Sequence, residues 1–255
     1  MATTAIIMVA GRGTRLRTFT DKPKSTLPVN DVPLIRRTVT LLLDRQIKVA
    51  LAIGYQHQAI KDCLQGLDVT YFYNPFFDVT NSIASLWFAQ EFLSGDVILF
   101  NGDVWFDEQI LDDLLAQPDD LVMLCDQSRV KVGDYFFQTD DRGILRKFGK
   151  ELPLAERTCE YVGFAKVSQH FLPQFTTRLN ELIDQQQHHL WWENVIYSFC
   201  EQYDVHTIDT NGRFWGEVDT VDDYKTITKH VKKGGKRTWN FLPLVPWKNF
   251  PVPWR

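Results

Sequence analysis

The sequence lacks the signals that mark several common classes of protein. Its four cysteines are widely scattered, and neither a Cys-x-x-Cys pair nor a histidine at zinc-ligand spacing accompanies them, which argues against a structural zinc site. No basic N-terminal segment leads into a long apolar run, and no stretch of the 255 residues approaches the length of a membrane span. We therefore expect no transmembrane segment and a cytoplasmic location, because a reducing compartment suits unpaired cysteines.

An excess of positive charge is also missing. The formal net charge is -4 at pH 7, so the chain has no general attraction for nucleic acid or anionic lipid. Any phosphate binding must then come from a local cluster of basic residues. Apolar residues make up 44% of the chain and charged residues 24%, which is close to an average globular composition and predicts a compact fold with a substantial core.

Short apolar runs of strand length alternate with amphipathic stretches in the first half of the chain. The apolar runs cover residues 5–9, 49–53, 69–72, 97–100 and 121–124. Between them, apolar residues recur every three and four positions over residues 33–45, 56–64, 82–92 and 107–115, as in helices that pack on a sheet. This alternation predicts an α/β fold with a mostly parallel sheet covered by helices on both faces.

The pattern changes after about residue 130. Two short runs, residues 135–137 and 144–148, flank Asp140-Asp141-Arg142-Gly143 and predict an inserted β-hairpin. We expect a further strand over residues 161–167 and helices over residues 169–186, 192–201 and 219–230. The predicted domain covers residues 1–230, and residues 231–255 form a tail rich in Trp and Pro. This tail is either an extended strap on the protein's own surface or a contact with another subunit or a membrane interface.

The first predicted strand runs directly into a glycine-rich loop, Ala10-Gly11-Arg12-Gly13-Thr14-Arg15-Leu16. Glycine at the carboxyl end of a parallel strand lets backbone N–H groups approach a phosphate closely, so Ala10, Gly11, Gly13 and Thr14 are candidates for binding a nucleotide. The Gly-Lys-Ser/Thr ending of a Walker loop and the third glycine of a Rossmann fingerprint are both missing. A tight turn without a ligand is the alternative interpretation.

A second basic element, Asp21-Lys22-Pro23-Lys24-Ser25-Thr26-Leu27-Pro28, follows within reach of this loop, so that Arg15 and Lys24 can face one anion. A solvated basic loop is the alternative. The order Gly-x-Gly-Thr-Arg-Leu, then Lys-Pro-Lys, then Leu-Pro-Val resembles the signature of the nucleotidyltransferase superfamily that makes nucleotide sugars and CDP-alcohols. The resemblance implies the nucleotide-diphospho-sugar transferase fold, a Rossmann-like three-layer sandwich with a mixed sheet, and catalytic roles for Arg15 and Lys24.

Two acidic residues far apart in the sequence are candidate metal ligands. The run over residues 97–100 ends in Asn101-Gly102-Asp103, at the sheet edge that carries the glycine-rich loop, and a carboxylate there suits magnesium. Asp219 precedes the last predicted helix and resembles the family's second acid, although a helix N-cap would also explain it. We assign Asp222 and Asp223 to the first turn of that helix, where the macrodipole favours negative charge. The expected cofactor is therefore Mg²⁺, held by Asp103 and Asp219.

The same resemblance suggests further roles around the site. Lys150 resembles a lysine that meets the phosphate of the acceptor, although an ordinary surface lysine is the alternative. Positions that resemble those near the base and ribose of the nucleotide are Gly54, Tyr55, Asn81, Ser82 and Ser85.

Within the superfamily, four segments resemble choline-phosphate cytidylyltransferases of the bacterial surface-polymer type. These segments are Asn74-Pro75-x-x-Asp78-x-Thr80-Asn81-Ser82, Glu160-Tyr161-Val162-Gly163, Trp192-Glu193-Asn194 and Glu217-Val218-Asp219. A trimethylammonium group requires aromatic faces and a carboxylate, because it cannot donate hydrogen bonds. Residues available for that contact are Tyr161, Trp191, Trp192, Trp215, Glu193 and Glu217. For each aromatic residue, ordinary core packing is the alternative.

Together these features predict an enzyme that transfers CMP from CTP to phosphocholine or a similar small phosphorylated alcohol or amine and releases pyrophosphate. Other acceptors stay open, namely aminoethylphosphonate, inositol phosphate, glycerol phosphate and a sugar 1-phosphate used with UTP, dTTP or CTP. Asn101-Gly102-Asp103 disfavours a glycosyltransferase, in which Asp-x-Asp is usual, and a non-catalytic nucleotide-binding protein would not need both Lys24 and two separated carboxylates. We expect no nucleic-acid partner, and a homodimer is one alternative for the oligomeric state.

Overall fold

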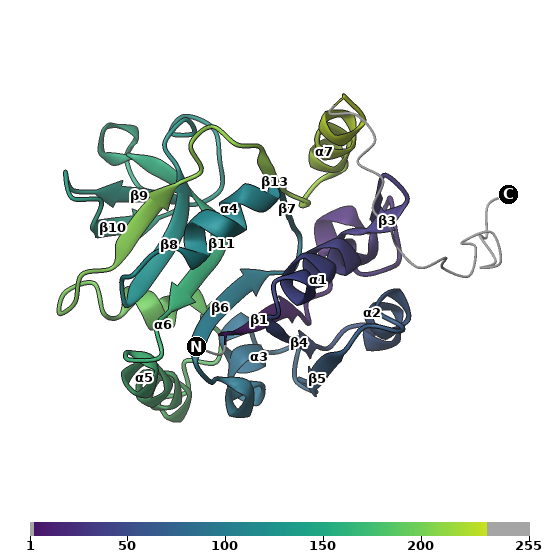
Figure 1. The fold of residues 1–255 in the computed structure, drawn as a ribbon, viewed down its shortest axis with the longest axis horizontal. Helices are drawn as coiled ribbons and strands as arrows, with labels where there is room; N and C mark the ends of the chain where they lie inside the picture. Colours follow the sequence, from purple (N-terminus) through teal and green to yellow (C-terminus); the bar gives the residue numbers. More distant parts are fainter. Residues whose placement is uncertain (1–2, 234–255) are drawn as a thin grey trace, which may run out of the picture.

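A nine-stranded mixed sheet forms the centre of the protein in the computed structural model, which describes residues 3–233 (Figure 1). The order β10-β9-β11-β6-β1-β4-β5 makes one path through the sheet, and β8 and β12 extend it from β11. All of these strands except β10 and β11 run in the same direction. Their bounds are β1 (Thr3–Val9), β4 (Lys48–Ile53), β5 (Val69–Tyr73), β6 (Asp96–Asn101), β8 (Leu121–Asp126), β9 (Phe136–Thr139), β10 (Leu145–Gly149), β11 (Cys159–Val167) and β12 (His206–Asp209).

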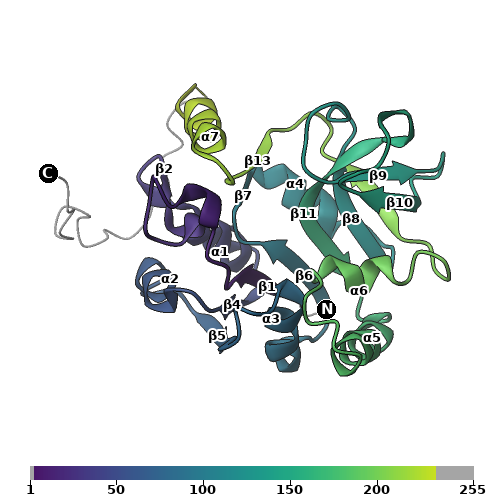
Figure 2. The same cartoon turned by 180° about the vertical axis from the view of Figure 1, so that it is seen from behind.

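Helices cover both faces of this sheet. Helix α4 lies in front of the sheet in Figure 1, and α6 lies in front of it when the molecule is seen from behind in Figure 2. The helices are α1 (Leu34–Asp44), α2 (His57–Cys63), α3 (Ser82–Phe88), α4 (Glu108–Leu115), α5 (Leu172–Asp184), α6 (Glu193–Tyr197) and α7 (Val221–Lys233). The predicted three-layer α/β fold is therefore confirmed.

The alternation of side chains along each strand separates the two hydrophobic clusters that lie on opposite faces of the sheet. On β1, Ile6 and Met8 belong to the cluster that packs against α3, α5 and α6, whereas Ala5, Ile7 and Val9 belong to the cluster that packs against α1, α2 and α4. Successive residues of a strand point to opposite faces, so a strand with helices on both sides must be apolar throughout. This explains why the short apolar runs in the sequence could be recognised as buried strands.

The strand order places the loops of the predicted site at one edge of the sheet. Strand β1 pairs in parallel with β4 on one side and β6 on the other, so the chain that follows each of these strands emerges at the same edge. Ligands bind at such a switch point in open α/β sheets. Gly102 allows the turn there, because a Cβ at this position would collide with Val9 and the carbonyl oxygen of Met8.

Two small strand pairs and the edge strand β12, which pairs with β8, were not expected from the sequence. Strand β7 (Val104–Phe106) pairs with β13 (Trp215–Glu217), and β2 (Pro28–Val29) pairs with β3 (Val32–Pro33). These strands are only two or three residues long, too short for an apolar pattern to appear. The hairpin of β9 and β10 agrees with the predicted insertion, whereas the helix predicted over residues 192–201 is confined to α6 and is shorter.

Helix α7 continues to Lys233, which lies inside the segment predicted as the tail. The rest of that tail prediction, residues 234–255, lies outside the described residues. Within residues 3–233, no helix combines the length and the apolar character that a membrane crossing requires.

Candidate functional site

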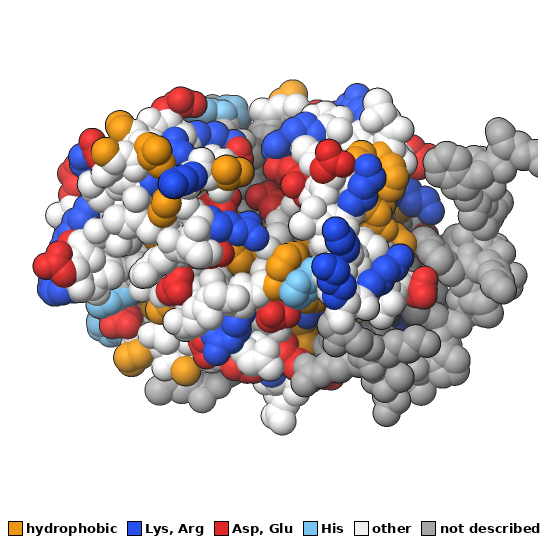
Figure 3. All heavy atoms as spheres, turned by 90° about the horizontal axis from the view of Figure 1, so that it is seen from above, with side chains coloured by type: hydrophobic (Ala, Val, Ile, Leu, Met, Phe, Trp, Pro, Cys, Tyr) orange, Lys and Arg blue, Asp and Glu red, His pale blue; other side chains and the backbone are white. Residues whose placement is uncertain are grey.

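A cavity of about 340 Å³ opens at the carboxyl edge of the sheet, in the size range of small-molecule sites. Figure 3 shows a hollow with acidic side chains inside it and Lys and Arg side chains near its rim. Fifteen of the candidate residues that the sequence singled out line the cavity: Ala10, Gly11, Gly13, Arg15, Lys24, Asn81, Ser82, Ser85, Asp103, Lys150, Tyr161, Trp191, Glu193, Glu217 and Asp219. The fold thus brings most of the predicted site together.

The glycine-rich loop and the following turn form one wall. Gly13 has a φ of 58°, a left-handed conformation that favours glycine. A Cβ at this position would touch the methylene groups of the Lys24 side chain. Arg12 ion-pairs with Asp78, which ties the loop to the segment that follows β5. Arg15 reaches in the other direction and places Nη2 2.8 Å from Oδ2 of Asp219. The loop is therefore fastened on two sides while its backbone lines the cavity.

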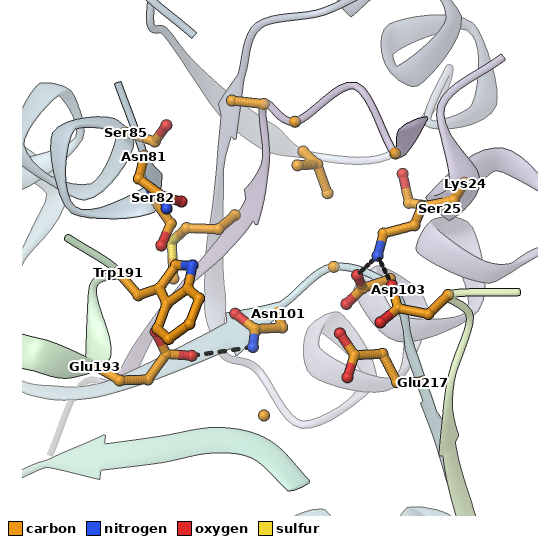
Figure 4. A pocket seen from close by; sticks show the side chains of 18 of the residues that line it. Lys24, Ser25, Asn81, Ser82, Ser85, Asn101, Asp103, Trp191, Glu193 and Glu217 are labelled. Atoms are coloured by element: carbon orange, nitrogen blue, oxygen red, sulfur yellow. Dashed lines mark hydrogen bonds and ion pairs between the residues drawn. The ribbon is translucent and has the colours of Figure 1, made fainter. Parts of the chain in front are cut away.

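Lys24 lies between the two acids that were predicted as metal ligands. Its Nζ is 2.6 Å from Oδ1 of Asp219. It also ion-pairs with Asp103, as Figure 4 shows. Burial alone would lower the pKa of Lys24, but Asp103, Asp219 and Glu217 outweigh this effect and raise that pKa above its ordinary value. Lys24 therefore stays charged at neutral pH, and it neutralises part of the acidic cluster.

Glu217 is the third member of this cluster, which the sequence had assigned to the acceptor instead. One oxygen each from Asp103, Glu217 and Asp219 lies within 4.8 Å of the others. Burial and the two neighbouring aspartates raise the pKa of Glu217. In addition, Oδ1 of Asp103 is buried without a hydrogen-bond partner. Three converging carboxylates with a spare buried oxygen fit a hard divalent cation.

Another part of the cavity wall, at the start of α3, carries three of the residues predicted near the nucleotide. The side chain of Asn81 accepts a hydrogen bond from the N–H of Ser82, and the hydroxyl of Ser85 accepts one from Asn74 at 3.0 Å. Ser82 Oγ accepts a hydrogen bond from the backbone N–H of Trp192 at 3.0 Å. These contacts fasten the start of α3 to neighbouring segments, so that Asn81, Ser82 and Ser85 form a firm wall.

Three other residues predicted near the nucleotide do not line the cavity: Gly54 and Tyr55, which pack against the glycine-rich loop, and Thr14 of the loop itself. Gly54 permits close packing, because a Cβ there would meet Phe77 and the carbonyl oxygen of Ala10. The N–H of Tyr55 donates to that same carbonyl oxygen at 3.0 Å. Thr14 begins the 3₁₀ turn Thr14–Leu16. Gly54 and Tyr55 therefore support the loop, and none of the three residues lines the cavity.

The end of the cavity away from Lys24 is lined by aromatic and acidic side chains. Tyr135 stacks on Tyr197 with a centroid distance of 5.8 Å and meets Trp191 edge-on at 5.8 Å. Nζ of Lys150 lies 5.3 Å from the centre of the Trp191 ring and 2.7 Å from Asp134. This end therefore already accommodates an ammonium group against an aromatic face and a carboxylate.

Trp192 and Trp215, both predicted to contact the acceptor, do not line the cavity. Trp192 is wholly buried in the cluster with α3 and α5, and its Nε1 donates to Oδ1 of Asn101 at 2.8 Å. The indole of Trp215 donates to Asp126 at 2.7 Å, and its ring packs against the guanidinium of Arg129. The structure therefore does not place either ring where it could contact an acceptor, because each packs in the core. Trp191, named with them, is the tryptophan that faces the cavity.

Two buried glutamates complete the acidic lining of this end. Burial raises the pKa of Glu193 to about 7, while a hydrogen bond from Asn101 opposes the rise. Burial likewise raises the pKa of Glu160 to about 7, against the effects of the Asp134 N–H and of Arg129. Glu160 belongs to a segment quoted for the resemblance but was not assigned to the site, since neighbouring residues of a strand alternate in direction and sequence alone does not say which one faces a ligand.

Glu160→Gln is expected to flatten the pH dependence of stability. The carboxyl ionises near pH 4.5 when unconstrained and near 7 in the folded protein, so between these values the folded state holds a proton that the unfolded state has lost. The free energy of unfolding therefore falls as the pH rises through this window, by on the order of 3 kcal/mol, and the loss is complete above pH 7. In urea unfolding, the free energy of unfolding of the variant minus that of the wild type should be more positive at pH 8 than at pH 5.

The matched control for this experiment is Glu201→Gln, which removes an exposed carboxyl. Its stability relative to the wild type should be the same at both pH values. If the difference between Glu160→Gln and the wild type is also independent of pH, the assigned proton on Glu160 is wrong.

Comparisons with known proteins agree with this geometry. Residues 5–206 match the MobA-like NTP transferase domain. The choline-phosphate cytidylyltransferase of Streptococcus pneumoniae is 24% identical over 89% of this chain and 98% of its own length. The CMP-5'-(3-aminopropyl)phosphonate synthase of Streptomyces rubellomurinus is 28% identical over 56% of this chain, which spans only 24% of that relative's length.

Among solved structures, the CTP:phosphocholine cytidylyltransferase from Streptococcus pneumoniae superimposes with a TM-score of 0.76. The match covers 91% of this chain and all of the other, at 19% sequence identity, and it shows a shared fold. With the domain match extending over most of the sequence and the cavity at the expected sheet edge, the chain belongs to the MobA-like NTP transferase domain family and is a nucleotidyltransferase.

Proposed function

We propose that the protein transfers CMP from CTP to a small phosphorylated alcohol or amine, with phosphocholine as the first choice, and releases pyrophosphate in the synthesis of a cell-surface polymer precursor. One observation carries the proposal. A single cavity joins a cluster of basic and acidic residues at Lys24 and Asp103 to an end lined by aromatic rings and buried carboxylates. The first part suits a triphosphate, and the second suits a cationic acceptor group.

Charge is the main obstacle to this reaction. A doubly charged acceptor phosphate that approaches the α-phosphate to about 4 Å meets a repulsion of roughly 8 kcal/mol at an effective dielectric constant near 20. Arg15 and Lys24 lie where they can offset this repulsion, and the backbone N–H groups of the glycine-rich loop can hold phosphate oxygens. Catalysis then needs positioning and electrostatics, with no covalent nucleophile.

Asp103, Asp219 and Glu217 would hold Mg²⁺ in this proposal. Bound there, Mg²⁺ would supply positive charge to the phosphates during transfer. Because Lys24 contacts two of these carboxylates, the lysine and the acids are placed to act on the same phosphates.

The acceptor would extend toward Trp191 and the buried glutamates. Lys150 is placed to meet its phosphate, and its contact with Trp191 supports this ring as a surface for cations. Glu193 and Glu160 add carboxylates that favour a positively charged head group. The four cysteines are all free, which supports the proposed cytoplasmic location. The homodimer and the role of the tail stay predictions.

A panel of substrates tests the proposal. With Mg²⁺ and pyrophosphate release as the measurement, CTP and phosphocholine are expected to give the highest kcat/KM among the common nucleoside triphosphates and a set of phosphorylated acceptors. Phosphoethanolamine, 2-aminoethylphosphonate, inositol phosphate, glycerol phosphate and glucose 1-phosphate complete the set. A clear preference for UTP or dTTP with the sugar phosphate would replace the proposal by nucleotide-sugar synthesis, and no turnover with any pair would favour a nucleotide-binding protein.

A further inference from the structure

Asn101 joins the strand that leads to Asp103 to the glutamate at the acceptor end. It is the last residue of β6, and its Nδ2 donates a hydrogen bond to Oε1 of Glu193 at 3.0 Å. In Figure 4 this contact is drawn from Asn101 to Glu193, with Trp191 beside them and Asp103 farther along the same wall of the cavity. The carboxylate is thereby held in one orientation at the edge of the cavity.

The direction of the Asn101 amide is fixed by Trp192. An indole N–H can only donate, so the atom of Asn101 that lies 2.8 Å from Nε1 of Trp192 must be the carbonyl oxygen. The amide nitrogen then has to face Glu193, where it can only donate. This chain of bonds gives the wholly buried Trp192 a role without any contact to a ligand.

Asn101 and its partner Trp192 are both held by the surrounding structure. Trp192 is anchored through its backbone N–H to Ser82 at the start of α3. Gly163 of β11 lies against Asn101, because a Cβ there would be 3.4 Å from both Cβ and Nδ2 of the asparagine. Its φ of 98° also favours glycine. The amide consequently has little freedom to turn away from Glu193.

We propose that Asn101 is a positioning residue for the acceptor: it aims the carboxylate of Glu193 at the cationic group of the substrate and so sets the affinity for that substrate. The inference rests on the proposed function, since it assumes a cationic acceptor. It also accounts for the amide in Asn101-Gly102-Asp103, where only Asp103 is needed for a metal. A carboxylate at position 101 would face Glu193 with an oxygen and repel it.

A double-mutant cycle tests this role. Asn101→Ala and Glu193→Gln are each expected to raise the KM for phosphocholine on the order of ten-fold, as for a lost hydrogen bond to a charged group, with the KM for CTP changed less than about two-fold. Because Asn101 acts through Glu193, adding Asn101→Ala to Glu193→Gln should raise the KM no further. Effects that multiply, or equal changes in both KM values, would overturn the inference.

The control is Asn180→Ala, because Asn180 also accepts a hydrogen bond from an indole, that of Trp87 at 2.9 Å, but does not line the cavity. It should lower the melting temperature without raising the KM for phosphocholine. A raised KM in this control would show that loss of stability alone produces the effect, and the inference would then fail.

A measurement without substrate separates this inference from the proposed function. The carboxyl ¹³C resonance of Glu193 can be titrated by NMR, and Asn101→Ala should raise its pKa above about 7, because the hydrogen bond from Asn101 favours the charged form. Asp103 and Tyr161, which also influence this carboxyl, are unchanged in the variant. An unshifted pKa overturns the inference whatever the acceptor is, whereas a wild type that is inactive with every cationic acceptor overturns the proposed function alone.

Discussion

Asp103→Asn is expected to lower kcat at least about 1,000-fold while the protein stays folded. The substitution keeps the size of the side chain but removes a charge from the cluster with Glu217 and Asp219, and a loss of this size corresponds to about 4 kcal/mol of stabilisation of the transition state. Oδ1 of Asp103 has no hydrogen-bond partner in the described structure, so no other bond to this atom is lost. The measurement is pyrophosphate release at saturating CTP and acceptor, with a melting curve for the same samples.

Asp222→Asn provides the matched control, because Asp222 is an exposed acid three residues beyond Asp219 whose carboxylate pairs with Lys225 of the same helix. Its kcat should equal that of the wild type within about two-fold, as for surface substitutions. The metal role of Asp103 is refuted if Asp103→Asn keeps more than about a tenth of the wild-type kcat at an unchanged melting temperature.

The central sheet could be predicted from the sequence because each of its buried strands is apolar on both faces. The runs at residues 49–53 and 97–100 lie within β4 and β6, and the intervening helices show a repeat of three and four residues. Those signals are local, since burial on both faces of β4 and β6 leaves an uninterrupted apolar run inside each strand. The edge at which the loops meet then follows from the parallel order, which is why Asp103 and the glycine-rich loop could be placed together.

The place of Glu217 could not be predicted, because it depends on a pairing between two very short strands. In the ribbon of β7 and β13, Glu217 lies opposite Val104, and the N–H of Val218 donates to the carbonyl oxygen of Asp103 at 2.9 Å. These contacts join residues more than 100 positions apart. Three-residue strands carry no readable period, so only the structure shows that Glu217 and Asp219 both reach Asp103.

The aromatic residues were ambiguous for a different reason. Trp191 and Trp192 are adjacent in the turn that leads into α6, where Trp192 is the N-cap residue, and their side chains point to different sides of this turn. One ring therefore faces the cavity and the other the core, and composition cannot say which. Trp192 still belongs to the site's architecture through Asn101, a contribution that a search for ligand contacts would overlook.

In the protein without nucleotide, Lys24 would compete with a metal for the carboxylates of Asp103 and Asp219. Its ammonium lies 2.6 Å from Asp219 and pairs with Asp103 as well. Its methylene groups pack near Gly13, so methionine at this position would keep most of the apolar contact. Removing the charge should then affect catalysis and metal binding in opposite directions.

Lys24→Met is accordingly expected to lower kcat on the order of 100- to 1,000-fold while Mn²⁺, measured by electron paramagnetic resonance without nucleotide, binds at least about ten-fold more tightly. The first effect follows from the lost stabilisation of phosphate charge, and the second from removing a cation that costs a bound divalent metal roughly 2 to 8 kcal/mol at about 4 Å, because the pair amounts to two unit-charge repulsions. Lys147→Met, which removes an exposed lysine paired with Glu156, should change neither quantity. If Mn²⁺ binds Lys24→Met no better than the wild type, then Asp103 and Asp219 do not form the metal site, because a metal held elsewhere would not respond to the charge between them.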